Sequence, residues 1–328
     1  MGWKGTVRSI NAAYRAAERD SKRRHRELQR QEKEYAKMQL LDQAVYDVDA
    51  YENHLERFLS IHKESISPIN WIGIKNQSEP KKPPLSSEHE DAAKQKEAAY
   101  KPSWIDRLFG LEKRKRTKLA SEIKQAIEQD VSANNQAELE WMNAHAEWAA
   151  DIALAEGILK DDAQAKLDAI RQIDPFSELT ELGSELKFSI DETGLLECEL
   201  MAHGKSVIPD EIKSLLSSGK LSVKKMPITK FYELYQDYVC GCALRIANEL
   251  FSILQEDKVV ITVIDTLLNT SNGHLEEKPI LSVLIPRVTM SKLNMVTVDP
   301  SDSMSNFIHN MSFNKKTGFS AVSKVNLS

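Results

Sequence analysis

The first 65 residues carry the hydrophobic pattern of one long helix. From Met38 onward, apolar side chains recur at alternating steps of three and four residues, which is the heptad spacing of a coiled coil. The predicted seam is Met38, Leu41, Val45, Val48, Glu52, Leu55, Leu59 and His62, with Glu52 as one acidic interruption. Residues 18–34 contain a single large apolar side chain, Leu28, so this part of the helix is predicted to be solvated.

A second long helix is predicted over residues 104–174, because no proline occurs there after Pro102 and only two glycines do. Its predicted seam is Ala137, Trp141, Ala144, Trp148, Ile152, Ala155 and Leu159. Large tryptophans that alternate with alanines are typical of closely packed helices. The two helices are therefore predicted to pair as a long antiparallel hairpin.

Between these helices, residues 66–103 form a predicted connector that five prolines interrupt. Within it, Ser87-x-x-Glu90 has the spacing of a capping box, in which each side chain binds the other residue's backbone N–H. This motif predicts a short helix that begins after Ser87 and ends near Tyr100.

Residues 175–328 change character and are predicted to form a small α+β domain. Leu186–Ile190 and Leu195–Ala202 are typical of two strands joined by a turn at Asp191-Glu-Thr-Gly194. Predicted elements follow in this order: a short extended piece at 222–223, a helix at 229–254, strands at 259–264 and 280–285, and a final helix that begins near Asp299. The order predicts an antiparallel sheet with helices on one face, followed by a polar, partly ordered tail from Phe313.

Composition narrows the class of protein. The chain has 328 residues, 12 glycines and 11 prolines, and its 44 basic and 49 acidic residues give a net charge of −5. It has neither an apolar run long enough to span a membrane nor an apolar segment of a secretory signal at its beginning. An odd count of three cysteines, Cys198, Cys240 and Cys242, does not suit a disulfide framework. We therefore expect a cytoplasmic protein.

The charges are unevenly distributed. Residues 1–37 hold eleven basic and five acidic side chains, a net charge of +6. The densest basic positions are Lys22, Arg23, Arg24 and Arg26, and a second cluster comprises Lys113, Arg114, Lys115 and Arg116. These clusters could contact the phosphates of nucleic acid, or pair with acidic positions on a helical partner. Pairing is favoured, because the predicted hairpin brings acidic residues beside both clusters; binding to a membrane is not expected.

One group of residues suggests catalysis. Asp265 ends a β-rich run, and Glu276 and Lys278 begin the next, a spacing that fits the loose pattern of metal-dependent nucleases. Two carboxylates would hold Mg²⁺, and the lysine would orient the attacking water. The competing interpretation is a charged hairpin loop that keeps the end of the sheet soluble. No other metal site and no other cofactor is predicted.

Three segments give the chain a family resemblance: Lys101–Phe109, Lys230–Tyr238 and Asp299–Phe307. Together they resemble an uncharacterised family of bacterial proteins with a charged N-terminal coiled coil and an α+β C-terminal domain. The resemblance implies a bacterial origin and a two-part architecture, and it transfers no activity and no site residues. Some proteins of this general build accompany anti-phage defence operons, which is an analogy of architecture alone.

The sequence therefore favours an interaction and assembly protein over an enzyme. The helices would form a homo-oligomer or bind a partner protein, and the α+β domain would serve recognition. The first alternative is a Mg²⁺-dependent nuclease or nuclease subunit. The second is an adaptor that binds nucleic acid through its basic clusters.

Overall fold

The computed structural model describes residues 3–104, 109, 111–181, 185–202 and 207–326, and it describes the side chains of residues 3–28, 178 and 181 no further than their backbone. The chain is α+β, with long helices and a mostly antiparallel sheet. It divides into two compact units. The sheet unit comprises Met1–Pro68 and Asp174–Ser328, and the clamp unit comprises Ile69–Ile173. The first long helix thus belongs with the C-terminal half of the chain and not with the second long helix.

The sheet unit holds all the described strands. In chain order its elements are α1 (Trp3–Leu59), η1 (Ile61–Lys63), α7 (Ser177–Glu181), β1 (Glu185–Ile190), β2 (Leu196–Met201), β3 (Glu211–Leu215), β4 (Leu221–Lys225), α9 (Ile228–Ile253), β5 (Lys258–Asn269), β6 (His274–Pro286), α10 (Arg287–Met290), α11 (Pro300–Ser303), η2 (Met304–Asn306), β7 (Ile308–Asn314) and β8 (Gly318–Ser320). Six strands form the main sheet in the order β1-β2-β5-β6-β7-β8, and β3 and β4 form a separate hairpin.

The sheet confirms the α+β prediction, with two differences. Strands β2 and β5 are parallel, while the other neighbouring pairs are antiparallel, so the sheet is mixed. The tail beyond Phe313, predicted to be partly ordered, contributes the end of β7 and all of β8. Phe313 pairs with Phe319 across the β7–β8 turn, and further along the tail the Val322 N–H donates to the Pro279 carbonyl of β6 at 2.9 Å.

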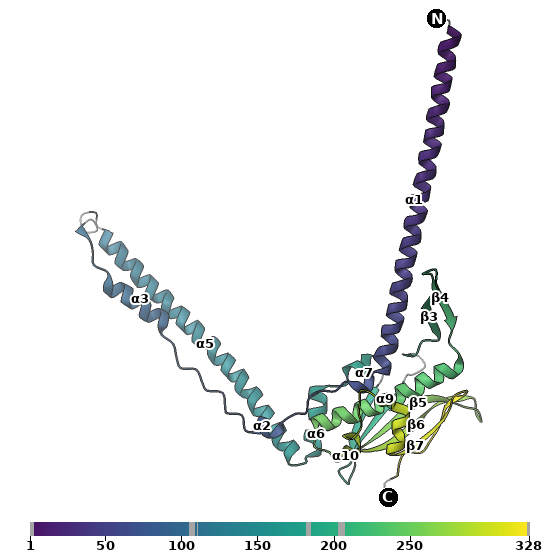
Figure 1. Cartoon of the computed structure of the whole chain (residues 1–328). Helices are drawn as coiled ribbons and strands as arrows, with labels where there is room; N and C mark the ends of the chain where they lie inside the picture. Colours follow the sequence, from purple (N-terminus) through teal and green to yellow (C-terminus); the bar gives the residue numbers. More distant parts are fainter. Residues whose placement is uncertain (1–2, 105–108, 110, 182–184, 203–206, 327–328) are drawn as a thin grey trace. The chain divides into compact units, whose positions relative to one another are not determined.

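Helix α9 supplies the core beneath the sheet, as Figure 1 shows. Tyr238, Leu244 and Ile246 of this helix are fully buried. The opposite face is covered by the end of the chain, where the Val325 side chain packs against Leu195, Val260 and Leu284. The two layers explain why β5 is apolar on both faces along its first half.

The covered side of α1 agrees with the predicted seam in part. The buried or half-buried positions are Leu41, Ala44, Asp47, Val48, Tyr51, His54, Leu55, Phe58 and Leu59. Met38 and Val45, which were predicted to lie in the seam, are 60% and 43% exposed. The predicted heptad spacing is present. The covered face of α1 is the one against which the β3–β4 hairpin and α9 pack. Gly219 in the β3–β4 turn has a φ of 78°, and its backbone lies against Leu41.

The clamp unit consists of α2 (Trp71–Lys75), α3 (Glu88–Ala99), α5 (Leu111–Leu159) and α6 (Ala163–Ile173). Helices α2 and α3 lie along α5, and an extended segment at residues 76–87, here called the strap, joins them (Figure 1). The predicted second helix is thus two helices, because Asp161 adopts a φ of 63° and the Asp162 carboxylate accepts the Ala165 N–H at 2.8 Å to begin α6.

The predicted pairing of the two long helices is not confirmed, because the tryptophans of α5 contact its own connector. The Trp148 indole donates to the Gln77 carbonyl at 3.1 Å, and the Trp141 indole donates to the Pro80 carbonyl at 2.9 Å. His145 lies between the two indoles, with ring centroids 5.4 and 5.5 Å away. A proline-rich segment has few N–H groups of its own, so its carbonyls are free to accept from side chains.

The short helix α3 forms where the sequence predicts it, but the capping box does not. The Ser87 hydroxyl donates to the Asp91 carboxylate at 2.9 Å and makes no cap to the backbone. Instead the buried carboxylate of Asp130 on α5 accepts the N–H groups of His89 and Glu90, at 3.1 and 2.7 Å. A side chain from the neighbouring helix therefore caps α3.

A candidate association surface on helix α1

The predicted nuclease residues lie on the β5–β6 hairpin, which is longer than expected. Asn272-Gly273 forms the turn, and the polar stretches on either side of it pair as strands and are not a loop. Asp265 is paired with Lys278, and Leu267 with Glu276, so the three polar residues share one face. A bulge at Ile280 causes this arrangement, since it shifts the alternation of β6 by one residue.

Asp265 is buried and already engaged. Its carboxylate accepts a short hydrogen bond from the Tyr235 hydroxyl of α9, and its other oxygen accepts the Thr266 N–H at 2.7 Å. Burial raises the pKa of Tyr235, and the nearby Asp265 carboxylate raises it further. The pair therefore joins α9 to the sheet as a buried hydrogen bond with the proton on the tyrosine.

Glu276 and Lys278 contact each other near the turn. Glu276 accepts from the side chains of Asn272 and Asn269 at 2.9 and 2.8 Å and from the Lys278 ammonium at 3.0 Å. The two amides and the ammonium lower the pKa of Glu276 to about 2. Across the residues whose placement is described, no group of three His, Cys, Asp or Glu side chains is arranged to hold a metal ion. Glu276 and Lys278 thus take part in a hydrogen-bonded network near the hairpin turn.

The predicted basic clusters lie in different units. Lys22, Arg23, Arg24 and Arg26 fall in the part of α1 whose side chains are outside the described residues. Lys113, Arg114, Lys115 and Arg116 are exposed in the first turns of α5. There the Arg116 guanidinium pairs with Glu112 of the same helix at 3.0 Å. Two acidic residues of the predicted second helix, Glu156 and Asp168, pair with Lys160 and Arg171 in their own unit.

The C-terminal end of α1 is anchored firmly on α9. The Phe58 ring is buried and meets Tyr238 edge to face at 6.2 Å, and His54 Nε2 lies 2.8 Å from the Val207 carbonyl oxygen. Just beyond the helix, the Ile66 N–H donates to the fully buried Glu249, which also pairs with Arg245 at 2.8 Å. Burial raises the pKa of Glu249, and the Ile66 N–H and Arg245 oppose this effect. The rest of the sheet unit thus holds α1 at its C-terminal end.

Further toward its N-terminus, α1 carries apolar side chains that are exposed in the described structure. All twelve residues from 29 to 40 are exposed. Tyr35, Met38, Val45 and Tyr46, here called the open stripe, are 64%, 60%, 43% and 69% exposed. At helical spacing these side chains fall within about 100° of one another, on the side of α1 away from β3–β4. Grouped large apolar residues on an exposed helix face are typical of an interaction surface.

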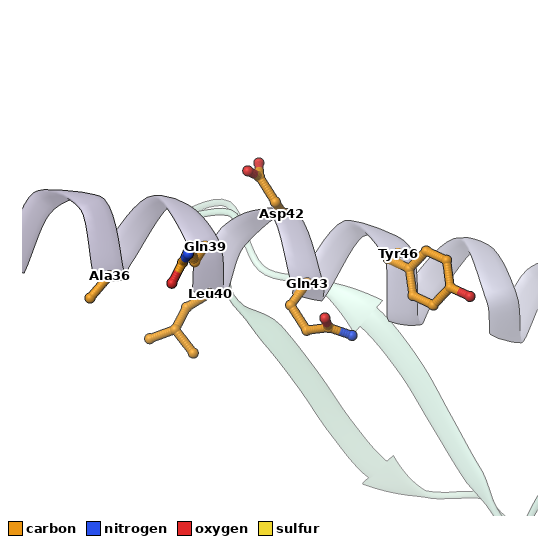
Figure 2. Close-up of a pocket in the computed structure, with 6 residues that line it drawn as sticks. All are labelled: Ala36, Gln39, Leu40, Asp42, Gln43 and Tyr46. Carbon is orange, nitrogen blue, oxygen red and sulfur yellow. The ribbon is translucent and has the colours of Figure 1, made fainter.

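A hollow beside the open stripe has walls from one element only. Figure 2 shows its lining on about three turns of α1: Ala36, Gln39, Leu40, Asp42, Gln43 and Tyr46. A small-molecule site normally encloses most of its ligand between several elements. The described lining residues of this hollow all lie on α1, so it does not have the form of such a site.

The anchoring of α1 could not have been found from its sequence pattern alone. The predicted seam contains Met38 and Val45, and both are instead exposed members of the open stripe. Two apolar series overlap on this helix, and the pattern does not say which one the chain itself covers. The available signal was the polar stretch at residues 18–34, which was predicted to be solvated and ends just before the open stripe begins.

None of the described helices is both long and apolar enough to cross a membrane. No protein-family model matches the chain, and no curated protein and no solved structure matches it either.

Proposed function

We propose that this chain is an assembly protein, in which α1 is a coiled-coil scaffold that associates with a second copy and carries the sheet unit as a recognition domain. One observation supports this most strongly: α1 is held at its C-terminal end, while residues 29–40 are exposed along their whole length. Most helical stability in proteins comes from packing of an apolar face, because isolated helices are marginal in water. A 57-residue helix with an uncovered apolar stripe is stabilised by a partner.

The polar surroundings of the open stripe suit a specific association. Gln39 and Asp42 lie among its aromatic and aliphatic members, and Asp49 continues the same side toward the C-terminus. Charged flanks limit non-specific aggregation and favour partners of matching charge. Association of this kind should weaken with salt but persist, since its core is apolar.

Light scattering on the full chain tests the proposal. The wild type should have twice the mass of one chain at micromolar concentration, and Met38→Glu should shift it toward the monomer, because a carboxylate in the apolar stripe costs free energy on association. Val131→Glu is the matched control, since Val131 is a similarly exposed apolar residue, 54%, on the other long helix. A wild type that is monomeric throughout, or a dimer lost through Val131→Glu alone, contradicts the proposal.

The nuclease and nucleic-acid hypotheses remain predictions and have their own tests. If Mg²⁺-dependent cleavage survives Asp265→Ala in a folded protein, Asp265 is not a catalytic residue and the nuclease hypothesis fails. Nucleic-acid binding through the basic clusters should weaken steeply between low and physiological salt. The absence of any such binding at low salt would contradict the adaptor hypothesis.

A further inference from the structure

Opposite charges divide α1 near its middle. Residues 3–37 hold eleven basic and five acidic side chains, a net charge of +6, whereas residues 38–59 hold one basic and five acidic side chains, a net charge of −4. Two such helices side by side and parallel would place like charges together along both halves. In the antiparallel arrangement each basic half lies beside an acidic half.

The apolar positions are also symmetric about the same point. By sequence position, Tyr35 and Met38 belong to a series with steps of three and four residues. Toward the C-terminus the series continues through Asp42 and Val45, and toward the N-terminus through Gln31 and Leu28. In an antiparallel pair centred between residues 36 and 37, Tyr35 faces Met38 of the second copy, and Leu28 faces Val45. Gln31 then faces Asp42, where an amide can donate to a carboxylate.

Neighbouring registers are less favourable. A shift of one heptad in one direction brings Met38 opposite Leu28 but Val45 opposite Ser21. A shift in the other direction brings Val45 opposite Tyr35 but Met38 opposite Asp42. Either shift separates apolar residues that the central register brings together. The covered side of α1, where Ala44 and Val48 are buried, is not needed for this contact.

We infer that two copies of this chain associate through the open stripe of α1 as an antiparallel pair, centred between Ala36 and Lys37. This inference rests on the proposed function and adds the orientation, the register and the side of the helix. It places the two sheet units at opposite ends of a shared helical rod.

Cysteine cross-linking of the full chain tests the orientation. Gln31 and Asp42 are both exposed, and the native cysteines are buried, so Gln31→Cys and Asp42→Cys introduce single accessible thiols. In the antiparallel pair, residue 31 of one copy faces residue 42 of the other. Residue 31 of that second copy lies eleven residues further along its helix, about 16 Å away, which is beyond the reach of a disulfide. A mixture of the two variants, exchanged by dilution and reconcentration, should therefore cross-link at least about tenfold more than either variant alone.

The alternative outcomes separate the two proposals. A dimer in which each variant cross-links with itself is parallel, which overturns the inference and leaves the proposed function standing. Leu40→Glu is the control for the side of the helix, because Leu40 is 72% exposed and lies across α1 from Met38. If Leu40→Glu dissociates the dimer and Met38→Glu does not, the open stripe is the wrong side. If no dimer forms in the wild type, both proposals fail.

Discussion

Each of the two long helices has apolar side chains that need cover from water, and the two helices differ in how they obtain it. Helix α5 has 49 residues and obtains its cover from the preceding 40 residues of its own chain, through α2, the strap and α3. Helix α1 has 57 residues, and among its described side chains those of the C-terminal third are covered, by the β3–β4 hairpin and α9. The difference lies in the side chains that each helix offers. Indole N–H groups can hold an extended segment by its carbonyls, whereas the tyrosines and aliphatic residues of α1 suit another helix.

The largest effect is expected at the α5 clamp. Trp141→Ala removes a half-buried indole, its hydrogen bond to Pro80 and its contact with the Lys82 ammonium 5.2 Å from the ring. We expect the clamp unit to lose about 2–3 kcal/mol of unfolding free energy, below the range for fully buried tryptophans. Denaturant unfolding with hydrogen exchange of residues 76–99 measures this.

Two neighbouring variants control for that substitution. Met142→Ala changes the next residue, which is exposed, and it should change the unfolding free energy by less than about 0.5 kcal/mol. Leu40→Ala on α1 should be equally mild, because the Leu40 side chain is 72% exposed. If Trp141→Ala is as mild as these two, the strap is not held by the tryptophans.

A smaller effect is expected at the cap of α3. Burial acts to raise the pKa of Asp130, but the N–H groups of Glu90 and His89 and the His89 ring together lower it below its usual range. Asp130→Ala should therefore release the first turn of α3, and its amides should exchange roughly tenfold faster. Asp151→Ala, an exposed acidic residue of the same helix, should leave α3 unchanged. Equal exchange in both variants would show that Asp130 does not act as the cap.

The smallest effect concerns the anchored end of α1. Burial lowers the pKa of His62, and Lys63 lowers it further, while Asp299 acts in the opposite direction. Because the unfolded chain binds the proton more readily, the free energy of unfolding should fall as the pH drops below about 6.5, and level off below the folded-state pKa. His62→Leu keeps a similar volume and should lack this part of the pH dependence. Unfolding of both proteins between pH 7.5 and 5, followed by circular dichroism, gives the difference, and identical slopes would contradict the prediction.

Much of the local structure could be predicted from the sequence. The turn at Asp191 forms as expected, since the Asp191 carboxylate accepts the N–H groups of Thr193 and Leu195 and Gly194 supplies a φ of 84°. Helix α9 begins and ends within one residue of its predicted bounds. The start of α11 is also confirmed, with the Asp299 side chain as its cap and Pro300 in its first turn. These features depend on neighbouring residues, whose chemistry the sequence states directly.

The candidate surface could be predicted only in part. Heptad spacing indicated that α1 has apolar sides, and the charge pattern indicated that its halves differ. The strands of the polar β5–β6 hairpin, and the bulge at Ile280 that turns Glu276 and Lys278 to the face of Asp265, depend on pairing between distant segments. Such pairing is chosen by total burial and hydrogen bonding across the sheet, which no local window contains.

By itself, the sequence determined two long helices, an α+β half, and a first helix with opposite charges on its two halves, because spacing and charge are properties of consecutive residues. Only the tertiary structure decided which segment covers each helix. The connector lies along α5 because Trp141, Trp148 and Asp130 bind its backbone groups. The β3–β4 hairpin and α9 cover one apolar side of α1 and leave Tyr35 and Met38 exposed, since a helix with two apolar sides gives no preference until a partner packs against one of them.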